Sequence, residues 1–372
     1  MLSVGSFVAG VIQEGDSMKA LVLAGGEGTR LRPITHTSAK QLVPVANKPI
    51  LFYGLEAIAS AGIEEVGIVV GETEAEIREA VGDGSAWGIR PHFIRQERPL
   101  GLAHAVLVAR DFLRDDPFVM YLGDNILKEG IVDLVREFES NRPNAQILLA
   151  KVPEPQRFGV AEVDDAGRVV RLIEKPKVPP SDLALVGVYM FDSTVHEAVA
   201  SIEPSWRNEL EITDAIQWMI DRGLDVRSHL ISGWWKDTGK LEDLLEANRF
   251  VLEALEPSIE GKVDDLSSIV GRVVIPKSAV VKNSVIRGPA IIGENTTIED
   301  SFIGPFTSIY YNCTVRSSTI EHSVVMENVT IVSIDRIEDS LIGKEAVVSR
   351  DLNLKPAALR LMVGDHSQVK LP

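Results

Sequence analysis

The sequence predicts an α/β domain with a mainly parallel sheet, followed by a parallel β-helix. Two patterns carry this prediction. In the first two thirds of the 372 residues, short apolar runs alternate with stretches of helical period, which is typical of βαβ units. In the last third, aliphatic residues recur every six positions, a period that suits the coils of a β-helix and neither an amphipathic helix nor a simple strand.

The first domain begins with a strand at 19–24, a continuous apolar run that ends in glycines. Further strands are predicted at 66–70, 92–95, 118–122 and 145–151. The helices between them are expected at 52–61, 74–81, 102–112 and 131–140. Ligands of parallel sheets sit beyond the carboxyl ends of the strands. We therefore expect the glycine-rich loop and Gly123-Asp124-Asn125, which each follow an apolar strand, to share one mouth.

After residue 151 the strands become shorter. Those predicted at 160–163, 169–173 and 185–191 resemble an antiparallel insertion that covers part of the mouth. Helices are expected at 209–222 and 241–255, and the second is suited to bridge two domains. The predicted organisation is an extension at 1–17, a first domain at 18–255, a β-helix at 256–355 and a tail at 356–372.

The six-residue period defines the inward positions of the predicted β-helix. Each aliphatic side chain is expected to point into the prism and to stack on its equivalent one coil away. Flat, regular faces favour closed symmetric assemblies, so we expect a homo-oligomer. The periodic positions are Val274, Val280, Ile286, Ile292 and Ile298, then, after a slip of one residue, Ile303, Ile309 and Val315, and again Val325, Ile331 and Ile337.

Composition and charge exclude several classes of protein. The net charge of −16 repels polyphosphate backbones, which argues against a nucleic-acid-binding protein. Cys313 is the only cysteine, so an intrachain disulfide and a thiolate zinc site are both excluded. No apolar run approaches the roughly 20 residues that span a bilayer, and residues 3–12 lack the basic region of a signal peptide. We therefore expect a cytoplasmic protein that does not bind membranes.

The glycine-rich loop after the first strand is a candidate phosphate site. A dinucleotide fingerprint would need a third glycine where Leu31 stands, which argues against a dehydrogenase, and no Walker Gly-Lys-Ser/Thr follows. What the loop offers is backbone amides together with Arg30 and, ten residues on, Lys40. Amide, guanidinium and ammonium groups suit anionic oxygens, so this set favours a polyphosphate ligand.

These residues also form part of a longer motif that is typical of one enzyme family. Residues 23–33, LAGGEGTRLRP, with KQLVPV at 40–45 and Lys48-Pro49, closely resemble the signature of sugar-1-phosphate nucleotidylyltransferases. Within that family the chain is most similar to long-form glucose-1-phosphate thymidylyltransferases. The resemblance implies a Rossmann-like nucleotidyltransferase domain followed by a C-terminal left-handed parallel β-helix. It runs in order over about 18–250, through Gln96, Gly101-Leu102-Ala103, Leu122-Gly123-Asp124-Asn125, Glu174-Lys175-Pro176, the ELEITD run at 209–214 and WKDTG at 235–239.

The resemblance implies a transfer between two polyanions. An oxygen of a hexose 1-phosphate attacks the α-phosphorus of a nucleoside triphosphate in line, and pyrophosphate leaves. Catalysis of this reaction is mostly alignment and charge neutralisation, and a phosphate oxygen that is already ionised needs no general base. Such an enzyme needs cations for the phosphates and carboxylates for Mg²⁺, and the sequence contains both.

Residue roles are carried over from the same resemblance. Asp124 and Asp237 would bind Mg²⁺. Arg30 and Lys40 would hold the triphosphate, and Lys175 the sugar phosphate, so the catalytic set is Arg30, Lys40, Asp124 and Lys175. The sugar phosphate would also meet Gly159, Glu174 and Val186. The nucleotide would meet Leu23, Ala24, Gly25, Gly26, Gly28, Thr29, Gln96 and Gly101.

Several alternatives stay open at the level of sequence. Phe158 stands where short thymidylyltransferases have a tyrosine, and Asn208 where many have glycine, which leaves the hexose undetermined. dTTP and UTP differ by one methyl group, worth about 1 kcal/mol of burial, so both remain candidate nucleotides. A UDP-glucose or other NDP-hexose pyrophosphorylase, a second sugar N-acyltransferase activity with His322 as its base, and a non-catalytic regulatory subunit are the further alternatives.

Overall fold

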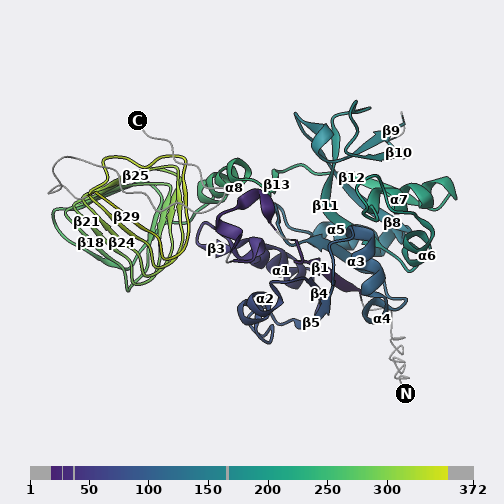
Figure 1. Cartoon of the computed structure of the whole chain (residues 1–372), viewed down its shortest axis with the longest axis horizontal. Helices are drawn as coiled ribbons and strands as arrows, with labels where there is room; N and C mark the ends of the chain where they lie inside the picture. The colour runs from purple at the N-terminus through teal and green to yellow at the C-terminus, as the bar shows by residue number, and fades with distance from the viewer. Residues whose placement is uncertain (1–17, 27, 37, 165–166, 351–372) are drawn as a thin grey trace, which may run out of the picture.

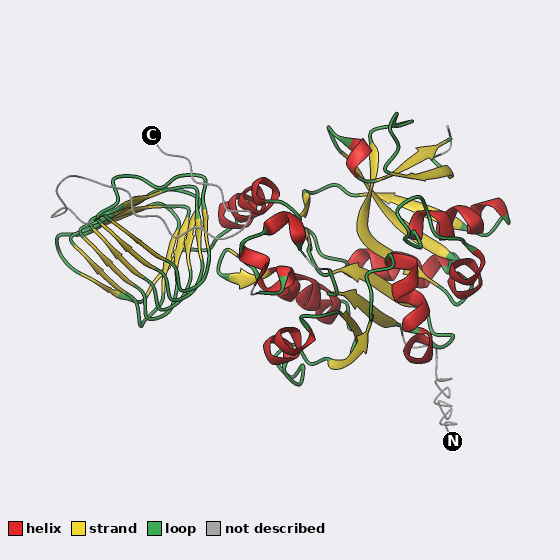
Figure 2. Cartoon of the chain, viewed as in Figure 1, coloured by secondary structure: helices red, strands yellow, loops and turns green. Residues whose placement is uncertain are grey.

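The computed structural model describes residues 18–350, except 27, 37, 165 and 166. The predicted extension at 1–17, the tail at 356–372 and residues 351–355 of the predicted β-helix lie outside the described residues. Figure 1 shows an α/β part beside a stack of short strands. Helices occur in the α/β part and at the junction, whereas the stack consists of strands and loops (Figure 2). Both halves of the predicted fold class are confirmed.

A nine-stranded sheet forms the centre of the α/β part. β1 pairs in parallel with β4 and β6, and β4 pairs in parallel with β5, as the βαβ pattern predicts. β11 runs antiparallel to β6, β8 and β9, and β9 to β10, which confirms the antiparallel insertion. The strands are β1 (Lys19–Leu23), β4 (Glu65–Val70), β5 (Arg90–Arg95), β6 (Phe118–Leu122), β8 (Ala145–Lys151), β9 (Gly159–Val163), β10 (Val169–Glu174), β11 (Leu183–Phe191) and β12 (Val226–Leu230).

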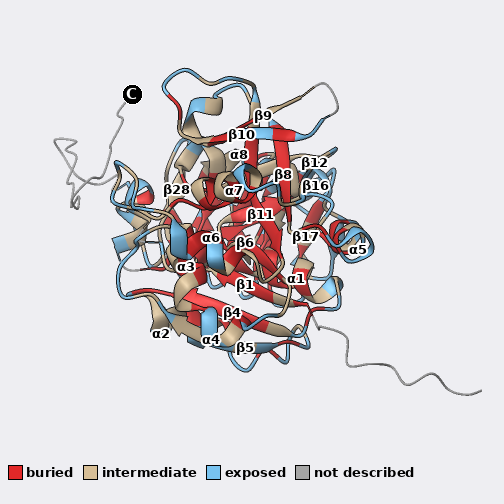
Figure 3. Ribbon diagram, turned by 90° about the vertical axis from the view of Figure 1, so that its right-hand side faces the viewer, coloured by how far each residue is buried: buried red, intermediate tan, exposed pale blue. Residues whose placement is uncertain are grey.

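Helices cover both faces of this sheet. One apolar cluster packs α1, α2 and α5 against it, and a second packs α3, α4, α6 and α7 against the other face. Figure 3 shows the buried residues concentrated in the central strands between the two layers. No helix among the described residues is both long and apolar enough to cross a membrane. The helices are α1 (Ile50–Ser60), α2 (Glu74–Val81), α3 (Leu102–Val108), α4 (Arg110–Leu113), α5 (Val132–Asn141), α6 (Val195–Ser201), α7 (Ile212–Asp221) and α8 (Leu241–Glu253).

Two predicted helices differ from the observed ones. The helix expected at 102–112 divides at Ala109 into α3 and α4. The helix expected from residue 209 begins only at Ile212, because the backbone of Leu210 pairs elsewhere. Its N–H donates to the carbonyl of Leu100 at 2.7 Å, and its carbonyl accepts from the N–H of Ala103 at 3.0 Å. These bonds fasten the segment before α7 to the loop before α3.

The stack of short strands has three parallel sheets, as expected for a β-helix. The first contains β14 (Ser258–Ile259), β17 (Val273–Ile275), β20 (Ala290–Ile292), β23 (Thr307–Ile309), β26 (Val324–Val325) and β28 (Leu341–Ile342). The second contains β15 (Lys262–Val263), β18 (Val280–Lys282), β21 (Thr297–Glu299), β24 (Thr314–Arg316), β27 (Thr330–Val332) and β29 (Val347–Ser349). The third contains β16 (Ser268–Val270), β19 (Val285–Arg287), β22 (Phe302–Ile303) and β25 (Thr319–Ile320).

The inward positions follow the predicted period with one correction. Ile286 pairs with Ile303 and Val281 pairs with Ile298, so residues 17 positions apart stack on each other inside the prism. Val274 and Val280 were expected inside, but both are only half-buried. Their neighbours fill the first complete coil instead: Val273, Ile275, Ala279 and Val281 are all fully buried. Counting back from Ile286 in steps of six gives Val280 and Val274. The chain instead takes a step of five residues from Val281 to Ile286, so the inward positions are Val281 and Ile275.

α8 connects the two parts of the molecule. Its buried residues Leu244 and Ala247 pack in one apolar cluster with Val43 and Val45 of the α/β part and with Val324 of the β-helix. This confirms that the second late helix bridges the two parts. The short hairpin of β2 (Pro44–Val45) and β3 (Lys48–Pro49) also lies at this junction.

Candidate active site

Two adjoining cavities open at the carboxyl ends of β1 and β6. One, of about 210 Å³, is lined by Leu23, Gly25, Gly26, Lys40, Gln96 and Gly101, among others. The other, of about 250 Å³, is lined by Arg30, Gly159, Glu174, Lys175 and Asp237, among others. Both are lined by Leu102, Leu122, Asp124 and Glu209, so they form one cleft with Asp124 at its middle. We refer to them as the nucleotide half and the sugar half, after the ligands that the sequence analysis expects in each.

Four residues named from the resemblance do not line either half with a side chain. Ala24 and Val186 are fully buried in the core, so neither presents a side chain to a ligand. Thr29 is exposed in the short helical turn after the glycines. Gly28 has φ +64°, and a Cβ there would lie 2.9 Å from Cβ of Lys40. Gly28 therefore shapes the loop that positions Lys40.

Asp124 and Asp237 come together from two paired strands. Asp124 follows β6, and Asp237 ends β13 (Trp235–Asp237), which pairs antiparallel with β7 (Asn125–Leu127) so that Asp237 lies opposite Asn125. Burial and the nearby charge of Asp124 raise the pKa of Asp237 to about 6. Burial alone would raise the pKa of Asp124, but the ammonium of Lys40, which contacts its carboxylate, lowers that pKa overall. The charges of these two half-buried carboxylates therefore repel each other.

This pair fits a magnesium ion. Mg²⁺ prefers oxygen ligands and usually takes only one or two carboxylates, because it keeps several waters and substrate phosphates. Among residues 18–350 outside the four gaps, no group of three or more His, Cys, Asp or Glu side chains forms a further metal site. A divalent cation would relieve the repulsion that raises the pKa of Asp237. Asp124 and Asp237 are thus a donor set of the expected size and charge.

The turn after Asp237 holds both carboxylates and the arginine of the glycine-rich loop. Thr238, fully buried, donates to the carbonyl of Asp124 through its N–H and its hydroxyl. The N–H of Gly239 donates to Oδ1 of Asp237 at 2.9 Å. A Cβ on Gly239 would lie 2.7 Å from Nη2 of Arg30, so only glycine leaves room for that guanidinium. The guanidinium of Arg30 is thereby brought beside Asp237.

The nucleotide half presents an amide side chain and tightly fixed backbone. Gln96 Nε2 lies 3.3 Å from the carbonyl of Gly101 and 2.9 Å from Nδ1 of His104. Gly101 has φ +105°, and a Cβ there would lie 2.3 Å from the carbonyl oxygen of Leu210, so no other residue fits. Gln41 also lines this half; it is 2% exposed, and its Oε1 has no hydrogen-bond partner among the described residues. The sequence prediction named Gln41 only as a family mark and missed this position.

The sugar half contains cations paired with carboxylates. Burial raises the pKa of Glu174, whose carboxylate lies 3.4 Å from Lys175 Nζ and 3.4 Å from the guanidinium of Arg207. Arg207 also contacts Glu209 at 2.8 Å and Glu211 at 3.3 Å. The sequence prediction missed Arg207, which lies two residues before the Glu-Leu-Glu segment at 209–211.

Aromatic rings form one wall of the sugar half. Phe158 packs edge-to-face on Trp235 with ring centroids 5.3 Å apart, and Trp235 Nε1 donates to Oδ1 of Asn125 at 2.5 Å. Trp234 instead stacks on Phe250 of α8, outside the cleft. Trp235 thus anchors the strand that carries Asp237 while it lines the cleft.

Comparison with known proteins gives matches over the whole described chain. The nucleotidyl transferase family model matches residues 19–254. Glucose-1-phosphate thymidylyltransferases of Streptomyces griseus and Streptomyces antibioticus are 58% and 60% identical, each over 95% of this chain and 99% of its own length. A solved structure from Bacillus anthracis, titled as a candidate glucose-1-phosphate thymidylyltransferase in complex with a sucrose, has a TM-score of 0.60 and 35% identity. That match covers 63% of this chain and 94% of the other.

Proposed function

This chain belongs to the nucleotidyl transferase family, among its glucose-1-phosphate thymidylyltransferases, and we propose that it forms dTDP-glucose and pyrophosphate from dTTP and glucose 1-phosphate. The observation that carries the residue assignment is the meeting of the two cleft halves at Asp124. Lys40 and Arg30 lie beside the carboxylate pair, and Lys175 and Arg207 line the sugar half. The cleft can therefore neutralise two polyanionic substrates and bring their phosphates together.

The chain's own residues align the reactants. Lys40 and Arg30 bind the triphosphate, and Arg30 neutralises the charge that passes to pyrophosphate as the bond between the α-phosphorus and its bridging oxygen breaks. Lys175 and Arg207 hold the sugar phosphate so that its ionised oxygen faces the α-phosphorus for in-line attack. Asp124 and Asp237 would hold Mg²⁺, which when bound supplies further neutralisation of the phosphates.

Nucleoside recognition rests on the other half of the cleft. Gln96 and the backbone of Gly101 meet the edge of the pyrimidine, and the backbone at 23–26 contacts the nucleoside and phosphates. Gln41 lines this half, and its buried Oε1 has no hydrogen-bond partner among the described residues, so we assign it as a further contact. UTP remains the competing nucleotide, since a methyl group is worth only about 1 kcal/mol.

His322 does not support the acyltransferase alternative. Its ring packs edge-to-face on Phe306 with centroids 5.1 Å apart. The guanidinium of Arg249 of α8 lies over the same Phe306 ring, and Asn248 Nδ2 donates to the Phe306 carbonyl. His322 does not line either half of the cleft. The regulatory-subunit alternative is also disfavoured, because Arg30, Lys40, Asp124, Lys175 and Asp237 are all present.

We further propose that the protein is a cytoplasmic homo-oligomer assembled through the β-helix. The outer faces of the β-helix expose Val270, Val285 and Val347, at 51%, 37% and 70% of their full surface. Exposed apolar side chains on regular, flat sheets suit a closed symmetric assembly. Sedimentation at micromolar concentration should show one species larger than the monomer of 40.6 kDa.

Pyrophosphate release is the direct test of the proposed reaction. Purified protein with Mg²⁺ should be assayed with dTTP, UTP, ATP and GTP against glucose 1-phosphate, galactose 1-phosphate, mannose 1-phosphate and glucosamine 1-phosphate. The highest kcat/KM is expected for dTTP with glucose 1-phosphate. Preference for a purine triphosphate, or no turnover with any pair, would refute the proposal.

A further inference from the structure

Asn248 of α8 is a buried amide that binds both parts of the molecule. It is 1% exposed. Its Oδ1 accepts from the N–H of Ala46 at 2.8 Å and from the hydroxyl of Ser308 at 2.7 Å, and its Nδ2 donates to the carbonyl of Phe306 at 3.1 Å. Ala46 belongs to the α/β part, whereas Phe306 and Ser308 belong to the β-helix. One side chain therefore joins three segments that are far apart in the sequence.

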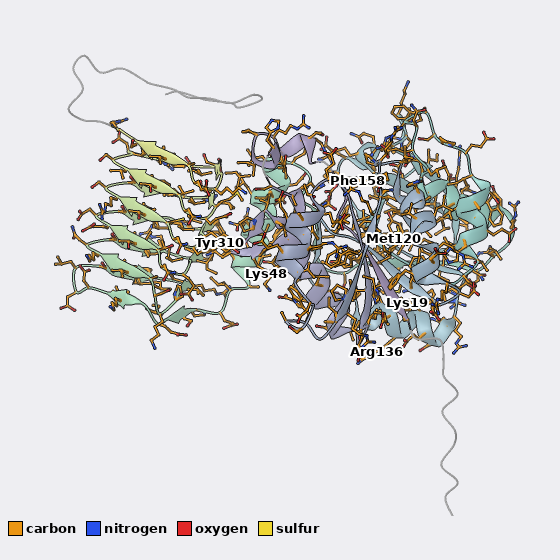
Figure 4. The ribbon with its side chains drawn as sticks, turned by 60° about the horizontal axis from the view of Figure 1, so that its bottom comes forward. Lys19, Lys48, Met120, Arg136, Phe158 and Tyr310 are labelled. Atoms are coloured by element: carbon orange, nitrogen blue, oxygen red, sulfur yellow. The ribbon has the colours of Figure 1, made fainter. Side chains whose placement is uncertain are left out.

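The turn that Asn248 binds makes a second bond to the β-helix. Ala46 and Asn47 connect β2 to β3, and both have left-handed backbones, with φ of 47° and 59°. Asn47 Nδ2 donates to the carbonyl of Ile309 at 2.7 Å. Figure 4 labels Lys48 and Tyr310, the residues that follow Asn47 and Ile309, near this junction. The turn is thus fixed on a single coil of the β-helix.

The Ala46–Asn47 turn and α8 each follow closely in sequence a residue that the proposed function assigns to the triphosphate or the metal. The turn follows the short helix Lys40–Leu42 by four residues, and Val43 and Val45 between them are fully buried. α8 begins four residues after Asp237. The segment that carries Lys40 therefore leads into the Ala46–Asn47 turn, and the segment that carries Asp237 leads into α8. Asn248 of α8 binds both this turn and the coil of the β-helix.

We propose that Asn248 is a positioning residue for the reaction. It fixes the position of Lys40 relative to Asp237, because it binds the Ala46–Asn47 turn to the β-helix. This role rests on the proposed function. A displacement of about 1 Å at a catalytic group can cost a hundredfold in rate, so a shift of the turn should reach the triphosphate. In the sugar half, Arg207 pairs with Glu174, Glu209 and Glu211 and not with α8 or the β-helix, so its hold on the sugar phosphate should be unaffected. The β-helix accordingly helps to position catalytic residues of the α/β part, in addition to its proposed role in assembly.

The test compares variants at the junction with a matched variant inside the β-helix. Asn248→Ala removes all three bonds, and Asn47→Gly removes the bond to Ile309 while keeping a residue that tolerates positive φ. Asn312→Gly is the control: Asn312 also has a positive φ, and its amide also makes hydrogen bonds, to Asn295 and Asn328 of neighbouring coils. For each variant, kcat and both KM values are measured per folded protein at 20 °C, with the unfolding temperature from circular dichroism.

Asn248→Ala should lower kcat about tenfold and raise the KM for dTTP at least threefold, with the KM for glucose 1-phosphate unchanged. Asn47→Gly should change the same parameters by smaller factors, which keeps the test valid if Asn248→Ala does not fold. Asn312→Gly should lower the unfolding temperature and change no kinetic constant. The proposal is overturned if Asn47→Gly and Asn312→Gly behave alike, or if folded Asn248→Ala keeps wild-type constants. An inactive wild-type protein would instead refute the proposed function.

Discussion

Thr238 donates two hydrogen bonds to one acceptor, the carbonyl oxygen of Asp124, from its N–H at 3.0 Å and from its hydroxyl at 2.8 Å. The two turns that carry the carboxylate pair are therefore joined through backbone, beneath the side chains that would meet the metal. The spacing of Asp124 and Asp237 is fixed by this bond pair and by the β7–β13 ladder, so small changes here should affect turnover more than folding.

Thr238→Val should separate these two effects. The change removes the hydroxyl bond and keeps the shape and the N–H bond, so the free energy of unfolding should fall by only about 1 kcal/mol. We expect kcat to fall about fivefold or more. Thr314→Val, on the outer face of β24, is the control and should leave turnover unchanged. Equal kinetics in both variants would contradict a positioning role for the hydroxyl.

Asp237→Asn should abolish most activity without weakening the fold. Because burial and Asp124 raise the pKa of Asp237, the ionised carboxylate opposes folding above its ordinary pKa, and a neutral amide removes that cost. We expect kcat to fall at least a hundredfold and the unfolding temperature measured without Mg²⁺ to stay the same or rise. Wild-type protein should gain thermal stability from added Mg²⁺, and the variant should gain less. A variant with near-normal kcat at limiting Mg²⁺ would show that Asp237 does not bind the ion.

Gly239→Ala should displace the guanidinium of Arg30. The added Cβ would lie 2.7 Å from Nη2, a contact that forces the arginine side chain to move. We expect a drop in kcat of at least tenfold with little change in the KM for glucose 1-phosphate. Gly233→Ala, in the loop before β13, would place its Cβ 3.2 Å from the flexible end of Glu129 and serves as the control. Loss of activity in the control as large as in Gly239→Ala would point to a general effect of this loop.

Arg207→Gln should weaken sugar-phosphate binding in particular. The variant removes one of the four cations that line the sugar half, and it leaves Glu174, Glu209 and Glu211 without their shared partner. The KM for glucose 1-phosphate should rise about tenfold or more, while the KM for dTTP stays within twofold. Arg227→Gln on the exposed strand β12 is the control. If both KM values of Arg207→Gln rise together, Arg207 supports the whole cleft and has no special relation to the sugar phosphate.

Cys313 should report on unfolding of the β-helix. It is 1% exposed, and burial raises the pKa of its thiol to about 11, so the thiolate is scarce at pH 8. We expect no reaction with a disulfide reagent at pH 8 in the native protein and stoichiometric reaction once urea unfolds the β-helix. Rapid labelling of the native protein would mean that this coil opens readily.

The sequence predicted those features that depend on local pattern. The glycine loop and Asp124 were expected at one mouth because each follows an apolar strand, and the cleft contains both. Arg207 was missed because its surroundings come from β10 and from the segment before α7, a pairing that no local spacing reveals. Asn248 was missed for the same reason: its partners are Ala46 and Ser308, 202 and 60 positions away. The errors at Val274 and Val280 arose because a regular count cannot place a five-residue step.

Most equivalent residues in successive coils of the β-helix lie 17 positions apart, so the length of this domain can change by whole coils. Ile286 and Ile303 occupy equivalent places, as do Ser284 and Ser301, whose hydroxyl-to-amide bonds repeat from coil to coil. Insertion or removal of one complete coil restores every column. Ile309 and Val325 lie only 16 positions apart and still pair inside the prism, so a coil that is one residue shorter is also accommodated. Related proteins can therefore have a longer or shorter domain by one or more whole coils, provided that the coil that binds Asn248 is kept.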